Sequence, residues 1–194
     1  MQRAVFIDRD GTISEEVGYI NHPSRFRVFP YSGAAIKLLN DNGWLAIVVT
    51  NQAGVARGYF AEDMIRTIHE TLKQEMAATD ARIDAIYYCA HHPSVGELPY
   101  RFDCDCRKPK PGLIRRAAEE FDIALAESWM VGDRHSDIEL ARNAGVNSAF
   151  VMSGYGRGEW EHQRQNWNHQ PDLTANHLLD AVKRIIDEPL GKRA

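Results

Sequence analysis

Short apolar runs alternate along the chain with longer amphipathic segments, and no other feature of the sequence limits the possible folds as strongly. The pattern predicts strands at 4–7, 45–49, 83–88, 128–131 and 146–152. It predicts helices at 32–42, 61–78, 112–121, 136–143 and 173–186. Strands that alternate with helices at this spacing form a parallel sheet with helices on both of its faces. We therefore expect an α/β fold with a doubly wound parallel sheet.

Length and charge limit the other possibilities. At 194 residues the chain is expected to be a single domain, 1–194, with room for an insert. A net charge of −4 argues against a nucleic-acid partner. No apolar run reaches the ~18 residues of a membrane span, and the apolar stretch at the N-terminus is too short for a signal peptide. We expect a monomer in the cytoplasm, with no membrane partner.

Three segments do not follow the alternation of strands and helices. Residues 89–111 contain cysteines and prolines and are expected to form an insert. Residues 153–171 are polar, and their glycines are expected to form a flexible turn. A structureless segment of that length is uncommon in a compact domain, so a helix within it is one possibility, and its role stays open. Residues 191–194 are expected to be disordered.

Two smaller features have simple structural interpretations. Ser136 and Glu139 are spaced as a capping box at the start of the helix predicted at 136–143. His69 falls on a predicted helix of mixed polarity, and we expect its side chain to be solvated.

Polar residues follow the ends of three predicted strands. Residues 8–12 follow the first strand, residues 50–52 the second and residues 132–137 the fourth, while the cations at 107–108 precede a helix. Because the carboxyl ends of parallel strands meet at one rim of a sheet, we expect these residues to gather there. Each group alone could be a turn, a helix cap or a solvated charge. Their shared position favours a functional site.

Clustered carboxylates, a hydroxyl and cations together suit phosphoryl transfer. Asp8 would attack phosphorus and form an aspartyl phosphate, and Asp10 would protonate the leaving oxygen and later deprotonate the attacking water. Thr50, Arg107 and Lys108 would neutralise the phosphoryl oxygens. Hard carboxylate oxygens are suitable ligands for Mg²⁺, and Asp133 would supply the ligand most distant in sequence.

The cysteines form a second cluster, within the expected insert. Cys89-x-His91 is followed, after twelve residues, by Cys104-x-Cys106. Four nitrogen and sulfur ligands with no open position are typical of a structural zinc site. His92 competes with His91 as a ligand, although the matching spacers favour His91. The alternative is a metal-free loop with reduced thiols.

The four polar motifs, Asp8-x-Asp10-Gly11-Thr12, Thr50-Asn51-Gln52, Lys108-Pro109 and Gly132-Asp133-x-x-x-Asp137, resemble those of the haloacid dehalogenase superfamily in its aspartate-nucleophile phosphatase branch. The resemblance extends from about residue 4 to residue 151. It implies a Rossmann-like fold with Mg²⁺ held by Asp8, the backbone carbonyl of Asp10, and Asp133. Asp137 would lie just outside the metal ligands or serve only as a helix-start carboxylate.

Longer stretches resemble one family within that superfamily, the heptose bisphosphate phosphatases, which are related to the histidinol phosphatases. These stretches are Glu16–Tyr19, Thr50–Gly58, Tyr87–Pro93 and Cys104–Pro109. The resemblance implies a small sugar bisphosphate substrate whose 7-phosphate is removed for the synthesis of nucleotide-activated heptose. It implies that the substrate site contains Asp8, Asp10, Glu16, Val17, Gly18, Tyr19, Thr50, Asn51, Gln52, Ala53, Arg107 and Lys108. Arg134 stands where the family usually has lysine and would contact the distal phosphate, with Arg57 as a weaker candidate.

Three alternatives stay open at this point. A histidinol-phosphate phosphatase, or another small sugar-phosphate phosphatase, would use the same chemistry on another substrate. A mutase or phosphotransferase would pass the phosphoryl group to an acceptor other than water. A non-catalytic sugar-phosphate binding module should have lost Asp8 or Asp10, and both are present.

Overall fold

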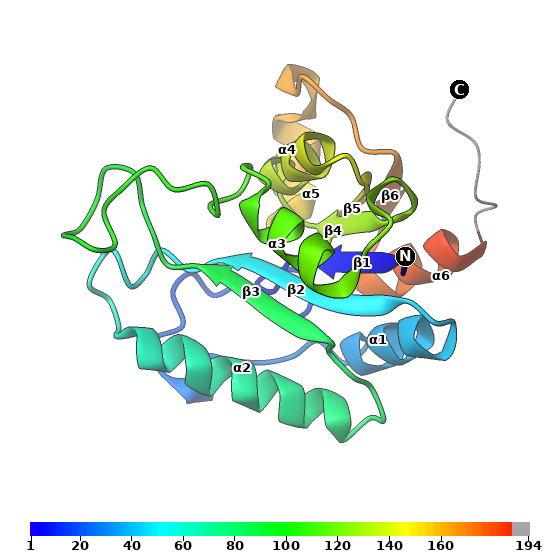
Figure 1. The fold of residues 1–194 in the computed structure, drawn as a ribbon, viewed down its shortest axis with the longest axis horizontal. Coiled ribbons are helices and arrows are strands. Elements are labelled where there is room, and N and C mark those ends of the chain that lie inside the picture. Colours follow the sequence, from blue (N-terminus) through cyan, green and yellow to red (C-terminus); the bar gives the residue numbers. More distant parts are fainter. Residues whose placement is uncertain (188–194) are drawn as a thin grey trace.

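A computed structural model of the chain describes residues 1–187 (Figure 1), so the expected disorder at 191–194 falls outside the described residues. The strands are β1 (Ala4–Ile7), β2 (Leu45–Asn51), β3 (Ala85–Cys89), β4 (Trp129–Gly132), β5 (Asn147–Val151) and β6 (Leu173–Ala175). The helices are α1 (Ser32–Asp41), α2 (Glu62–Ala77), α3 (Gly112–Phe121), α4 (His135–Ala144), α5 (Gly156–His162) and α6 (Leu178–Asp187). Short 3-10 turns lie at Pro23–Arg25, Leu125–Glu127 and Arg164–Asn166.

The six strands form one parallel sheet in the order β3-β2-β1-β4-β5-β6. β1 lies inside the sheet between β2 and β4, so the first strands of the two halves, β1 and β4, are neighbours. The chain winds outward in one direction from β1 through β2 and β3, and in the other direction from β4 through β5 and β6. The predicted doubly wound α/β fold is confirmed. Ligands of such sheets bind where the winding direction reverses, which here is between the carboxyl ends of β1 and β4.

The core has two layers because successive strand residues point to opposite faces of the sheet. Val5 and Ile7 pack in the layer formed with α1, α2 and α6, whereas Ala4 and Phe6 pack in the layer formed with α3 and α4. Figure 1 shows α1 and α2 on one side of the sheet and α3, α4 and α5 on the other. Burial on both faces explains why the inner strands are continuously apolar in sequence. The sheet can therefore hold the polar strand ends at fixed positions.

The C-terminal part differs from the sequence prediction. The helix expected at 173–186 is divided into the short edge strand β6, which pairs with β5, and the helix α6. In a strand of three residues, the alternation of apolar and polar side chains is too short to be distinguished from helical periodicity. Residues 153–171 do contain a helix, α5, so Gly156 and Gly158 lie in a helix rather than in the expected flexible turn.

Two local predictions were wrong. α4 begins at His135 with Arg134 as its N-cap, and the backbone N–H of Arg134 donates to Asp137 Oδ2 at 3.1 Å, so Ser136 and Glu139 do not form the capping box. His69 is not solvated, because it lies on the inner face of α2 and is only 6% exposed. The helix starts one residue earlier than expected, and His69 is held inside by Arg9, which is sixty positions away in sequence.

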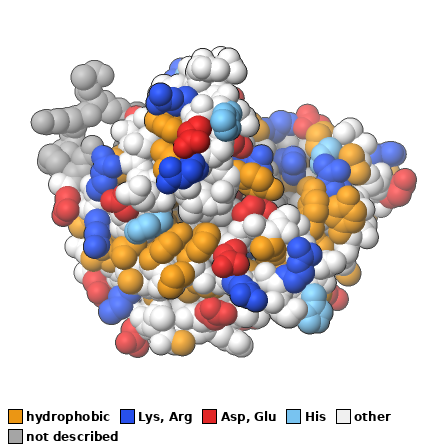
Figure 2. Space-filling model, turned by 180° about the vertical axis from the view of Figure 1, so that it is seen from behind, with side chains coloured by type: hydrophobic (Ala, Val, Ile, Leu, Met, Phe, Trp, Pro, Cys, Tyr) orange, Lys and Arg blue, Asp and Glu red, His pale blue; other side chains and the backbone are white. Residues whose placement is uncertain are grey.

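The surface shows both signs of charge. Figure 2 presents one face of the molecule, on which Lys and Arg side chains are interspersed with Asp and Glu side chains. Within residues 1–187, no helix combines the length and apolar character needed to cross a membrane.

Phe6→Ala tests the central role of β1 in the core. Phe6 is fully buried, and its truncation should lower the free energy of unfolding by about 3–5 kcal/mol. Leu98→Ala is the control, because Leu98 is 77% exposed and its change should stay within about 0.5 kcal/mol. Urea denaturation of both variants measures the difference. Equal losses would contradict the described core.

Candidate active site

A polar cavity of about 570 Å³ opens at the carboxyl edge of the sheet, beside the ends of β1 and β2. Of the residues expected to bind substrate, all but Val17 line this cavity: Asp8, Asp10, Glu16, Gly18, Tyr19, Thr50, Asn51, Gln52, Ala53, Arg107, Lys108 and Arg134. The Val17 side chain instead packs against the core. Segments far apart in sequence therefore meet at the predicted rim.

Lys108 occupies the centre of this arrangement. Its ammonium nitrogen lies 2.8 Å from Asp8 Oδ1 and 2.8 Å from Asp137 Oδ1, and its side chain is 3% exposed. The Lys108 backbone is also fixed, because its N–H donates to Asn51 Oδ1 at 3.1 Å and its carbonyl accepts from Asn51 Nδ2 at 3.3 Å. Burial favours the neutral amine, but the charges of Asp137 and Asp8 outweigh it and raise the pKa of Lys108. Asp137 thus has two roles: it pairs with Lys108, and it accepts the hydrogen bond from the Arg134 N–H at the N-terminus of α4.

Three buried carboxylates lie together beside Lys108. Oxygens of Asp8, Asp133 and Asp137 lie within 4.8 Å of one another. Burial raises the pKa of Asp8 to about 7, despite the opposing charge of Lys108. Burial, and then the charges of Asp8 and Asp137, raise the pKa of Asp133 well above its usual range. The cluster has more negative charge than one ammonium group balances, and its hard oxygen donors fit a divalent cation such as Mg²⁺.

Two glycines leave room for Asp133. A Cβ atom on Gly11 would lie 2.1 Å from Asp133 Oδ2, and one on Gly154 would lie 2.2 Å from the same oxygen. Both glycines also have positive φ angles, +86° and +54°. Asp133 is held by the Tyr155 N–H, which donates to Oδ2 at 2.8 Å. Gly11 belongs to the first motif, but only the fold brings Gly154 to the same carboxylate.

Thr50, at the end of β2, is linked through Gln52 to Asp10, the second aspartate of the first motif. Gln52 Nε2 donates to Thr50 Oγ1 at 3.0 Å and to Asp10 Oδ2 at 2.8 Å. Thr50 is only 1% exposed, so its hydroxyl is fixed beside the cavity. Hydrogen bonds thus hold the Thr50 hydroxyl, the Gln52 amide and the Asp10 carboxylate next to one another at the cavity. These polar groups can contact a phosphoryl group.

One wall of the cavity was only partly expected from the sequence, which placed residues 132–137 at the rim but none of 139–163. It comes from the start of α4 and from α5, and its further residues are His135, Ser136, Glu139, Tyr155, Glu159 and Gln163. Arg134 Nε lies 3.2 Å from Glu159 Oε1, and the Arg134 guanidinium lies over the Tyr155 ring at 4.4 Å. The unusual length of the segment 153–171 was the one sequence feature that hinted at additional structure there. That the segment folds back to the rim as α5 depends on tertiary contacts. Arg57 is not in the wall and instead contacts His92 at 3.1 Å.

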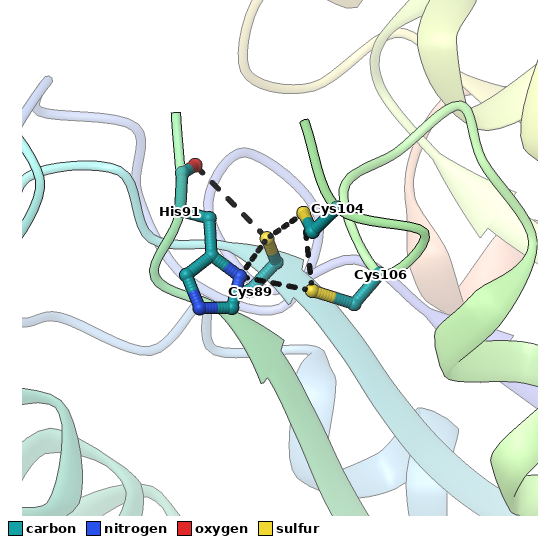
Figure 3. Close-up of side chains that lie close together, drawn as sticks. All are labelled: Cys89, His91, Cys104 and Cys106. Atoms are coloured by element: carbon teal, nitrogen blue, oxygen red, sulfur yellow. Dashed lines mark hydrogen bonds between the residues drawn. The ribbon is translucent and has the colours of Figure 1, made fainter. Parts of the chain in front are cut away.

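The cysteine cluster is assembled as the sequence predicted (Figure 3). In the figure, His91 and the three cysteines point toward one another from the end of β3 and the following insert. The Cys89–Cys104 and Cys104–Cys106 sulfurs are 3.5 and 3.3 Å apart, and His91 Nδ1 lies 3.7 and 3.3 Å from Cys89 and Cys106. These separations are close to the ~3.8 Å between sulfurs of a tetrahedral zinc site. All three cysteines are free thiols.

His92 does not join this cluster. Its Nδ1 lies 3.2 Å from the Ser94 backbone nitrogen and 3.1 Å from that of Val95. This nitrogen therefore organises the turn after His92, and His91 is the histidine that lies with the three cysteines.

Comparisons with known proteins agree with this geometry. A family model described as HAD-hydrolase-like matches residues 105–181. The chain is 37% identical to D-glycero-beta-D-manno-heptose-1,7-bisphosphate 7-phosphatase of Haemophilus ducreyi, with 95% of this chain and 98% of that protein covered. It is 38% identical to D-glycero-D-manno-heptose-1,7-bisphosphate 7-phosphatase of Thermosynechococcus vestitus, with 94% of each covered.

Among solved structures, the chain is similar to D,D-heptose 1,7-bisphosphate phosphatase from B. bronchiseptica, crystallised with magnesium and phosphate. The TM-score is 0.85 at 29% identity, over 97% of this chain and 100% of that one. The shared length, the sheet and the buried carboxylate cluster lead to one assignment. The chain belongs to the D-glycero-D-manno-heptose-1,7-bisphosphate 7-phosphatase family of the haloacid dehalogenase superfamily.

Proposed function

We propose that this protein removes the 7-phosphate of D-glycero-D-manno-heptose 1,7-bisphosphate and leaves the 1-phosphate on the sugar, for nucleotide-activated heptose synthesis. The observation that carries the proposal is the buried Asp8–Lys108 pair on the floor of a cavity with arginines at its rim. A buried carboxylate next to a fixed ammonium group supplies a nucleophile and a counter-charge for phosphoryl oxygens in one place.

The reaction has two halves. In the first, an Asp8 carboxylate oxygen attacks phosphorus, the bond from phosphorus to the sugar oxygen breaks, and the Asp10 carboxyl gives its proton to that oxygen. In the second, Asp10 takes a proton from water as the water oxygen attacks phosphorus, and the bond to Asp8 breaks to release inorganic phosphate. Thr50 and Lys108 contact the phosphoryl oxygens in both halves.

Two metal ions have separate sites in this proposal. Asp8, the backbone carbonyl of Asp10, and Asp133 would hold Mg²⁺, which supplies positive charge to the carboxylates and the phosphate. Cys89, His91, Cys104 and Cys106 would hold Zn²⁺, which ties the insert 89–111 to the end of β3. Three free thiols suit a reducing compartment, so we propose a cytoplasmic protein. We also propose a monomeric, single-domain enzyme, because this one chain supplies all the described walls of the cavity.

The second phosphate would be held at the rim. Arg107 and Arg134 both line the cavity and can contact the 1-phosphate while the 7-phosphate reacts. Arg134 is paired with Glu159, so a phosphate there competes with a carboxylate for the same guanidinium. Holding the far end of the substrate converts binding energy into orientation at phosphorus.

A phosphate-release panel tests the substrate. The heptose 1,7-bisphosphate should give a higher kcat/KM than either heptose monophosphate or histidinol phosphate. Arg134→Ala should reduce the preference for the bisphosphate roughly tenfold, since a hydrogen bond to a charged group is lost. It should leave hydrolysis of p-nitrophenyl phosphate nearly unchanged. Faster hydrolysis of histidinol phosphate would overturn the substrate but not the phosphatase chemistry.

Gly154→Ala tests the contact with Asp133. The new methyl group should displace that carboxylate and raise the Mg²⁺ concentration for half-maximal activity by roughly tenfold or more. Gly43→Ala is the matched control: Gly43 also has a positive φ, +72°, but has no atom within 4 Å of its added Cβ. The control should lose about 1–2 kcal/mol of stability and keep the wild-type Mg²⁺ dependence. Identical Mg²⁺ titrations of the two variants would contradict the assignment.

Cys104→Ser tests the zinc site. The wild type should contain about one zinc per chain, and the variant should lose it and unfold at a lower temperature. Glu97→Gln, an exposed change in the same insert, should keep both the zinc and the Tm. Metal analysis and thermal unfolding give the two readouts. A wild-type protein that is folded without zinc would refute the prediction.

A further inference from the structure

Arg9 is a buried cation outside the chemistry described so far. It lies between the two aspartates of the first motif, and its side chain pairs with Asp10 and is only 1% exposed. Its Nε donates to Asp10 Oδ1 at 2.9 Å and its Nη2 donates to Asp10 Oδ2 at 2.6 Å. This two-pronged contact fixes the plane of the carboxylate as well as its position.

Two further donors complete the surroundings of the Asp10 carboxylate. Gln52 Nε2 donates to Oδ2 at 2.8 Å and the Ser14 hydroxyl donates to Oδ1 at 3.3 Å. Each carboxylate oxygen thus accepts two hydrogen bonds.

His69 fixes Arg9 from the opposite side. Arg9 Nη1 donates to His69 Nε2 at 3.2 Å, and the Phe26 ring lies 5.9 Å from the guanidinium carbon. Burial, followed by the charge of Arg9, lowers the pKa of His69 to about 3. The imidazole is therefore neutral at physiological pH, and its Nε2 lone pair is available as an acceptor. His69 lies on α2, so this contact joins the helical layer to the catalytic rim.

We propose that His69 and Arg9 are positioning residues, which hold the Asp10 carboxyl in place for proton transfer to the leaving oxygen. The inference rests on the proposed phosphatase function, and it adds a buried histidine that does not line the cavity. A merely structural Arg9–His69 pair would affect folding and every substrate alike. A positioning pair affects those substrates whose leaving group needs the proton.

The test compares His69→Leu with His69→Gln on two kinds of ester. Leucine removes the acceptor for Arg9, whereas the glutamine Oε1 can replace Nε2. The alkyl substrate is the best sugar phosphate of the substrate panel, whichever it is, and the aryl substrate is p-nitrophenyl phosphate. The kcat/KM value covers the steps up to leaving-group departure. A nitrophenolate leaves without a proton, but a sugar alkoxide does not, so the ratio of the two kcat/KM values isolates the acid step.

His69→Leu should lower kcat/KM for the sugar phosphate by roughly tenfold to a hundredfold and change that for the aryl ester by less than about twofold. His69→Gln should restore most of the loss. Tyr88→Phe is the control, because Tyr88 packs against His69 at 5.6 Å but its hydroxyl donates to Glu62 on α2 rather than to the Arg9–Asp10 pair. This control should lose stability and keep the wild-type ratio.

Equal losses on both esters in His69→Leu, or no loss on either, would overturn the positioning role while the phosphatase function stands. A wild-type enzyme that hydrolyses the histidinol ester best changes the proposed substrate and leaves this test intact, because the ratio uses whichever alkyl ester is preferred. A wild-type protein that hydrolyses no phosphate ester would overturn the proposed function and this inference together.

Discussion

The Lys108 ammonium group lies between the Asp8 and Asp137 carboxylates, 2.8 Å from each and shielded from solvent. Removing these charges from water is costly, and only close pairing offsets the cost. The pairing joins the end of β1, the insert before α3 and the start of α4. Because those elements come from both halves of the sheet, the cluster fixes the geometry of the rim as well as its charge.

The insert is placed by the same cluster. Cys106 lies two residues before Lys108, so the cysteine cluster and the buried Lys108 cation belong to one short stretch of chain. Arg107, between them, donates to the His91 carbonyl at 3.3 Å. Lys108 has its own hydrogen bonds to Asn51 and Val49, which do not involve the cysteine cluster. Loss of zinc should therefore disturb Arg107 more than Lys108, and substrate binding more than the phosphoryl-transfer chemistry.

Much of this arrangement could be predicted from the sequence because parallel strands bring their carboxyl ends together. The first motif, the cysteine spacing and the helix at 112–121 required only local patterns and that rule. The remainder depends on contacts between distant segments. β6 is too short to have a recognisable period, Gly154 is constrained by Asp133, and Glu159 reaches the cavity only because α5 folds back over β5. His69 was expected in solvent because its partner, Arg9, is sixty positions away in sequence.

The proposed chemistry depends above all on Asp8, which forms a covalent phosphoryl intermediate during turnover. The most direct measurement is to quench the enzyme in acid while it hydrolyses substrate, reduce it with borohydride and map the product by peptide mass spectrometry. Borohydride converts an aspartyl phosphate to an alcohol but leaves a free carboxylate unchanged. We expect reduction at position 8 only in the presence of substrate, and none in Asp8→Asn. An active enzyme with no reduced peptide, or with the reduced side chain at another position, would contradict this chemistry.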